Sequence, residues 1–141
     1  MERRAFLKTT CKLCALGAAG IALPQVITSC GNLQSLSITL PIEKGKISVP
    51  ISLFEKETIQ LIRPKGWIYN IAVLKTIKGF DAVLMKCTHM DNQLHPSFEG
   101  FRCNMHGSEF NKEGKVKKGP AEKDLQHFDV VLKEGYVEIV L

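Results

Sequence analysis

Two short segments of the chain each carry one cysteine and one histidine, and they constrain the fold more than any other feature. The first is Cys-Thr-His at residues 87–89, and the second is Cys-Asn-Met-His-Gly-Ser at residues 103–108. Together they offer two thiolates and two imidazoles but no carboxylate, which is a ligand set suited to a soft or borderline transition metal. We therefore expect a fold that brings two loops to one metal centre.

Two kinds of metal centre fit this ligand set. A structural zinc site would gather all four side chains around one ion, usually with close-spaced cysteines in one arm and close-spaced histidines in the other. A two-iron cluster with two thiolates on one iron and two imidazoles on the other needs loops that each contribute one cysteine and one histidine. The sequence has this mixed arrangement, which favours the two-iron cluster and leaves zinc as the alternative.

The stretch from residue 87 to residue 121 resembles the Rieske family, whose signature is Cys-x-His in one loop and Cys-x-x-His-Gly-Ser in a second. A Gly-Pro-Ala segment at residues 119–121 is similar to the family's third loop, which packs beside the cluster. The resemblance implies one [2Fe-2S] cluster and an all-β, antiparallel, Rieske-like sandwich with a cluster-binding subdomain built from loops. It also implies four cluster ligands: Cys87, His89, Cys103 and His106.

The same ligand set predicts the redox behaviour. Two ferric ions, two sulfides, two thiolates and two neutral imidazoles give an oxidised site with no net charge, so an electron enters more readily than at an all-cysteine site. The second nitrogens of the imidazoles, if exposed, can exchange a proton, which would couple electron uptake to proton uptake.

Further residues are expected beside the cluster, and two of them bear on its potential. High-potential members of the family have a Ser and a Tyr that bond to cluster sulfurs; here Ser108 is kept, but Phe110 stands at the Tyr position. Those members also join the loops by a disulfide, whose positions are occupied here by Asn92 and Met105. We therefore predict a low or intermediate potential within the family range of about −150 to +300 mV. The residues expected beside the cluster are Gly107, Ser108, Phe110, Gly119 and Pro120.

The N-terminal segment resembles a twin-arginine export signal that ends in a lipobox. Arg3 and Arg4 precede an apolar stretch at residues 13–27, and Ile-Thr-Ser-Cys follows at residues 27–30, where Cys30 would receive lipid. We expect an export signal at residues 1–29, a lipid-anchored tether at residues 30–35 and a Rieske domain at residues 36–141. An uncleaved N-terminal anchor, as in the Rieske subunits of cytochrome bc complexes, is the alternative. Both place the protein at a membrane, exported and facing the periplasm or the cell exterior.

The remaining cysteines and the net charge point to no additional function. Cys11 and Cys14 form a Cys-x-x-Cys, but they lie in the segment expected to be removed, where small apolar residues are common. The formal net charge is +5, and +3 of it falls in residues 1–29, where four basic residues meet one acidic residue. The other residues carry the remaining +2, and a domain with so small a net charge is no strong binder of nucleic acid.

The rest of the chain predicts a single all-β domain. Its 141 residues are 45% hydrophobic and 23% charged, which is typical of one globular domain. Apolar residues alternate with polar ones after residue 36, Pro50 indicates an edge strand or a bulge, and residues 133–135 (Lys-Glu-Gly) indicate a hairpin. We predict strands over residues 36–40, 47–54, 58–62, 67–75, 81–86, 125–132 and 136–141.

Two histidines and a group of lysines are not used by the motif. His95 and His127 are expected at the surface, because the set of four ligands is complete without them. The lysines either dock an acidic redox partner or line a solvated turn. They are Lys112, Lys115, Lys117, Lys118 and Lys123.

The function implied by the resemblance is a membrane-tethered one-electron carrier with no catalytic centre of its own. Its expected donor and acceptor are redox proteins: a cytochrome, a quinol-oxidising complex or the large subunit of a molybdenum oxidase. An oxygenase catalytic subunit would need a mononuclear iron on two histidines and a carboxylate in a second domain, and only His95 and His127 are spare. The alternative class is a zinc-stabilised surface lipoprotein with a structural or binding role.

Overall fold

The structure is a computed structural model that describes residues 37–141. The expected export signal at residues 1–29, the lipid attachment at Cys30 and the tether at residues 30–35 lie outside the described residues. Within residues 37–141, no helix is long and apolar enough to cross a membrane.

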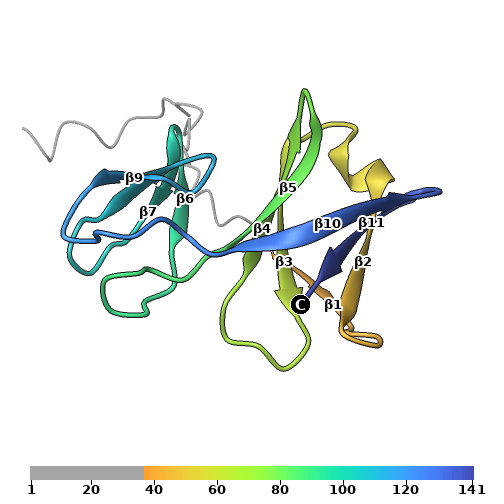
Figure 1. The fold of residues 1–141 in the computed structure, drawn as a ribbon, viewed down its shortest axis with the longest axis horizontal. Coiled ribbons are helices and arrows are strands. Elements are labelled where there is room, and N and C mark those ends of the chain that lie inside the picture. The colour runs from red at the N-terminus through yellow and green to blue at the C-terminus, as the bar shows by residue number, and fades with distance from the viewer. Residues whose placement is uncertain (1–36) are drawn as a thin grey trace, which may run out of the picture. The chain divides into compact units, whose positions relative to one another are not determined.

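Residues 37–141 form two β-sheets (Figure 1), with seven strands in the order β1-β3-β4-β5-β10-β11-β2 and four in the order β6-β7-β8-β9. All pairs are antiparallel except β1 and β3, which run parallel. The larger sheet contains β1 (Ile38–Leu40), β2 (Lys46–Pro50), β3 (Ile59–Pro64), β4 (Ile71–Thr76), β5 (Gly79–Leu84), β10 (His127–Lys133) and β11 (Tyr136–Val140). The smaller sheet contains β6 (His95–Ser97), β7 (Gly100–Arg102), β8 (Glu109–Asn111) and β9 (Val116–Lys118). The one helical element of the described range is a 3-10 turn, η1 (Ile51–Phe54).

The strands β3, β4 and β5 are buried on both faces and separate two hydrophobic cores. Because successive side chains of a strand point to opposite faces, Ile71 and Val73 of β4 enter one core and Ala72 and Leu74 enter the other. The first core lies within the larger sheet, between β2, β11 and the central strands. The second core joins the central strands to the smaller sheet and contains Cys87 and Cys103. The two cysteines of the predicted metal-binding motif therefore lie in a hydrophobic core.

The sequence predicted the all-β class correctly but misplaced several strand boundaries. Pro50 ends β2, which is an edge strand as predicted, and the chain then turns into η1 instead of continuing the strand. The strand predicted over residues 67–75 begins only at Ile71, because Gly66 adopts a φ of +88° and residues 65–70 form the β3–β4 connection. The three-residue strands β6 to β9 were not predicted, since three residues are too few to show a period.

Candidate metal centre

The two Cys-His segments form loops with the same backbone hydrogen bonds. Ligand loop 1 (residues 87–92) follows β5, and ligand loop 2 (residues 103–108) connects β7 to β8. In each loop the N–H of the cysteine donates to the carbonyl five residues later, that of Asn92 at 2.8 Å and that of Ser108 at 2.9 Å. The cysteine carbonyl accepts from the N–H four residues later, at 2.9 Å in loop 1 and 3.0 Å in loop 2. Both loops thus form the same hydrogen-bonded turn.

The fourth residue after each cysteine needs a left-handed backbone to close this turn. Gly107 supplies it in loop 2 with a φ of +79°, and Asp91 supplies it in loop 1 with a φ of +54°. Glycine reaches this region without cost, whereas a residue with a Cβ enters it less easily, aspartate and asparagine being the most tolerant. Gly107, predicted beside the cluster, therefore has a backbone role.

The loops hold their cysteines inward and their histidines outward. Cys87 and Cys103 are both buried free thiols, each about 1% exposed, in the same hydrophobic core. His89 and His106 are both exposed, and their ring centroids lie 5.0 Å apart with the rings almost perpendicular, at 88°. The structure therefore buries the two predicted thiols in one core and brings the two predicted imidazoles together at the surface.

This arrangement fits a two-iron cluster. In residues 37–141 no group of three or more His, Cys, Asp or Glu side chains is arranged to hold a single metal ion. A [2Fe-2S] cluster of the mixed Cys/His type asks for two protein ligands on each iron, one pair of thiolates and one pair of imidazoles. The donor set and its division into two pairs meet that requirement.

The predicted third loop, residues 119–121, together with the four residues that follow it, is hydrogen-bonded to both ligand loops. The segment formed by residues 119–125, hereafter the third segment, receives a bond from loop 1, where Thr88 Oγ1 donates to the carbonyl of Lys123 at 2.6 Å. Toward loop 2, the N–H of Ala121 donates to Ser108 Oγ at 3.0 Å. Because the Ser108 oxygen accepts here, its own proton is left to donate elsewhere. Gly119 and Pro120 are exposed, and the peptide bond between them is cis.

The two positions expected for an inter-loop disulfide, Asn92 and Met105, have other roles in this structure. Asn92 donates its side-chain amide to the carbonyl of Met90 in its own loop at 3.0 Å, and Met105 is 66% exposed. Phe110 is buried and lies opposite Phe101 in the β7–β8 pair. The two ligand loops are therefore connected through hydrogen bonds to the third segment.

Several supporting residues carried no recognisable sequence signal. Tyr69, in the β3–β4 connection, donates its hydroxyl to the carbonyl of Asp91 at 2.6 Å, and Lys86 Nζ lies 3.0 Å from Asp91 Oδ2. Gly100 lets β7 approach β8, because an added Cβ would lie 2.2 Å from the carbonyl oxygen of Phe110. Gly100 is the first residue of β7, and a glycine in a strand can indicate such an approach, but the Tyr69 contact depends on tertiary structure alone.

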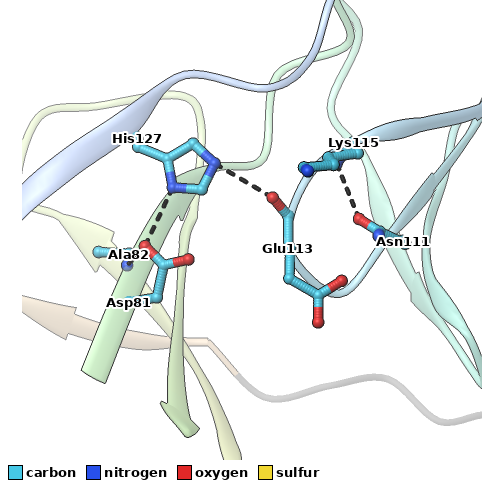
Figure 2. Close-up of polar contacts among 6 residues, drawn as sticks. All are labelled: Asp81, Ala82, Asn111, Glu113, Lys115 and His127. Carbon is cyan, nitrogen blue, oxygen red and sulfur yellow. Dashed lines mark hydrogen bonds and ion pairs between the residues drawn. The ribbon is translucent and has the colours of Figure 1, made fainter. Parts of the chain in front are cut away.

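The remaining histidines and lysines lie outside the ligand set. His95 is exposed, and His127 is bonded to Asp81 and to the carbonyl of Glu113 (Figure 2), so both are surface residues as predicted. Lys117 forms an ion pair with Glu99, which raises the pKa of the lysine and lowers that of the carboxylate. The five lysines predicted as a group are all exposed: Lys112, Lys115, Lys117, Lys118 and Lys123.

Comparison with known proteins matches the same part of the chain. The family model of the Rieske [2Fe-2S] domain matches residues 42–129, which include both ligand loops and the third segment. The iron-sulfur subunit 2 of the cytochrome b6-f complex from a Nostoc species is 32% identical over 59 residues, or 40% of this chain and 33% of the relative. The same subunit from Trichormus variabilis has the same identity and coverage. The chain thus spans about a third of the length of these curated relatives.

Two solved structures are also similar. One is the plasma membrane Rieske protein PetC3 from Synechocystis, at 26% identity and a TM-score of 0.48, covering 70% of this chain and 88% of that one. The other belongs to a complex of reduced oxygenase and oxidised ferredoxin in carbazole 1,9a-dioxygenase, at 25% identity and a TM-score of 0.53, covering 70% of this chain and 94% of that one. With the family match, the second likeness confirms the predicted sandwich with its loop-built subdomain.

Proposed function

The chain belongs to the Rieske [2Fe-2S] domain family, whose members bind one [2Fe-2S] cluster, and we propose that it acts as a membrane-tethered one-electron carrier. In this proposal it has no catalytic centre of its own and serves as the electron-transfer component of an oxidoreductase or quinol-oxidising complex. The curated relatives support the carrier role, because they are iron-sulfur subunits of a cytochrome b6-f complex. A bound cluster supplies the transfer of single electrons.

The ligand assignment rests on the division of the four side chains into two pairs. Cys87 and Cys103 would hold one iron, because both thiols are buried in one core. His89 and His106 would hold the other, because their exposed rings lie 5.0 Å apart at the loop tips. This pairing is the single observation that carries the proposal. The buried side excludes water, and the exposed side would be the edge from which a partner exchanges electrons.

The surface around the exposed imidazoles suits contact with a protein. Met90 follows His89 and is 60% exposed, and Met105 precedes His106 and is 66% exposed. Exposed methionines adapt their shape to a partner surface. We propose that the donor and acceptor are redox proteins of the classes expected above, namely a cytochrome, a quinol-oxidising complex or a molybdenum oxidase large subunit.

The membrane tether is the part of the proposal that depends on sequence motifs. Residues 1–29 would be the export signal, Cys30 the lipidated residue, residues 30–35 the tether and residues 36–141 the Rieske domain. The domain would then work outside the cytoplasm, facing the periplasm or the cell exterior. Mass spectrometry of the protein recovered from membranes tests this: a lipid-modified N-terminus at Cys30 supports it, and an intact N-terminus at Met1 overturns it.

Metal analysis tests the cluster assignment. We expect the purified full-length protein to contain two irons and two inorganic sulfides per chain, with an electron spin resonance signal on reduction. Replacing His89 by Gln should abolish this signal, whereas His95→Gln, which removes an exposed imidazole outside the loops, should leave it unchanged. One zinc per chain without sulfide would overturn the assignment in favour of the structural zinc site. Equal loss of the signal in both variants would overturn the ligand assignment.

A further inference from the structure

A histidine outside the ligand loops connects the two sheets (Figure 2). Nδ1 of His127, on β10, lies 3.0 Å from Asp81 Oδ1 on β5, and Nε2 lies 3.1 Å from the carbonyl oxygen of Glu113. Glu113 belongs to the turn between β8 and β9, in the smaller sheet, whereas β5 and β10 are neighbours in the larger sheet. One imidazole therefore spans the two sheets by hydrogen bonds at both of its nitrogens.

Both partners of this imidazole are acceptors. The carbonyl of Glu113 can only accept, so Nε2 must carry a proton to bond with it. The Asp81 oxygen already accepts the N–H of Ala82 at 2.9 Å and, when ionised, also only accepts, so Nδ1 must carry a proton as well. A neutral imidazole has one N–H and can satisfy one partner at a time. Both contacts at once require one proton more than neutral imidazole plus carboxylate provide.

The Glu113 turn is fixed by several further contacts. Gly114 has a φ of +74°, and an added Cβ there would lie 3.1 Å from Leu125 Cβ and 3.4 Å from His127 Nε2. Its N–H donates to the carbonyl of Asn111 at 3.0 Å, and its carbonyl accepts from the N–H of Leu125 at 2.8 Å. In Figure 2 the N–H of Lys115 also bonds to the Asn111 side chain, at 2.8 Å. The turn is thus packed against His127 and closes the hairpin whose first strand, β8, follows ligand loop 2 directly.

The charges around His127 come from each element that packs on it. Asp81 faces it from β5, and this carboxylate is the charged group bonded to the ring. The β8–β9 turn contributes Glu113, whose carboxylate points away from the ring in Figure 2, and Lys115. On β10 itself the nearest charged side chain is Asp129. The imidazole is 45% and Asp81 33% exposed, so protons reach both from solvent.

We propose that His127 is a positioning residue that holds the β8–β9 turn, and through β8 the second ligand loop, against the larger sheet, and that it does so fully only when both of its ring nitrogens are protonated. Histidine is the side chain that ordinarily changes charge between about pH 5 and pH 8. The attachment of the smaller sheet would therefore loosen when the ring loses one of its two protons. The inference does not depend on the ligand assignment, because His127, Asp81 and Glu113 are not proposed ligands.

Amide hydrogen exchange of the full-length, cluster-loaded protein tests the proposal. Protection in the peptide covering residues 111–116 is measured from pH 5.5 to pH 8.5 and corrected for the intrinsic pH dependence of exchange. We expect the corrected protection to fall about two- to tenfold with rising pH, as loss of one hydrogen bond implies. A corrected protection that stays constant across this range would overturn the proposal.

Three variants separate the positioning role of His127 from a general loss of stability. His127→Gln should leave the turn at the low protection of high pH, without a transition, whereas His95→Gln should behave as the wild type. Asp81→Asn removes the carboxylate that faces Nδ1, so the pH profile of protection should differ from that of the wild type. Persistence of the transition in His127→Gln overturns the proposal. If that variant does not fold, a pH profile in Asp81→Asn that is identical to that of the wild type overturns it instead.

Discussion

Ligand loops 1 and 2 have the same backbone turn but are supported in different ways. Loop 2 closes on Gly107 and is fixed from inside by Ser108, which is fully buried and accepts the N–H of Ala121. Loop 1 closes on Asp91 and is fixed from outside by polar contacts to Tyr69 and Lys86. Its bond from Thr88 to the third segment is exposed. The same turn is thus stabilised by burial in one loop and by exposed side chains in the other.

Hydrogen bonds to the third segment connect the two loops in place of a disulfide. Each loop is anchored to the third segment by one hydrogen bond, and the second core fixes that segment through buried Ala121 and Leu125. The buried anchor should matter more, because a buried donor that loses its partner cannot turn to water. Support is therefore expected to be unequal between two loops that look alike.

Removal of the two hydroxyl anchors should show the largest difference. Ser108→Ala leaves the buried N–H of Ala121 without its acceptor and should lower the free energy of unfolding by about 1–3 kcal/mol. Thr88→Val removes an exposed bond, after which the carbonyl of Lys123 can bind water, so the loss should be about 0.5 kcal/mol. Thermal unfolding of the cluster-loaded variants measures both values. Equal losses would show that burial does not distinguish the two loops.

Alanine at the equivalent left-handed positions should give the next largest difference. Gly107→Ala adds a Cβ that meets no atom within 4 Å, so its cost is conformational, about 1–2 kcal/mol. Asp91 already has a Cβ at this position, so Asp91→Ala should lose only the exposed Lys86 pair and the greater tolerance of aspartate for this backbone, together about 0.5–1 kcal/mol. The two substitutions form a matched pair, measured by thermal unfolding under the same conditions. A larger loss for Asp91→Ala would mean that the exposed support of loop 1 is stronger than its geometry indicates.

The sequence predicted the ligand loops better than their support, and the reason is physical. The predicted ligands of each segment lie within one short turn, Cys87 and His89 two residues apart and Cys103 and His106 three, so their pattern is visible in the chain itself. Strands such as β10 and β11 were visible through their period of two. Trp67 and Tyr69 suggested a strand by composition, but they serve a connection that packs on the first core and on loop 1. The contacts of Tyr69 and His127 join segments far apart in sequence, and no local pattern encodes them.

The smallest expected effect concerns a carboxylate outside both loops, and it tests whether the loop differences are local. Glu138 on β11 bonds to Lys133 at 2.8 Å and to Lys46 at 3.1 Å, and these hydrogen bonds lower its pKa below the ordinary value of 4.5. A carboxyl group with a lowered pKa stabilises the fold above its unfolded-state pKa, and this contribution is lost as the pH falls through the folded-state value. Glu138→Gln should therefore lower the melting temperature slightly at pH 7, and the difference from wild type should shrink as the pH falls below 4.5 and vanish once the carboxyl is protonated in the folded state. Hydrogen exchange in loops 1 and 2 should stay as in the wild type. If it rises in either loop, the loops share their stability with the whole sheet, and the contrast between buried and exposed support cannot be a property of the loops alone.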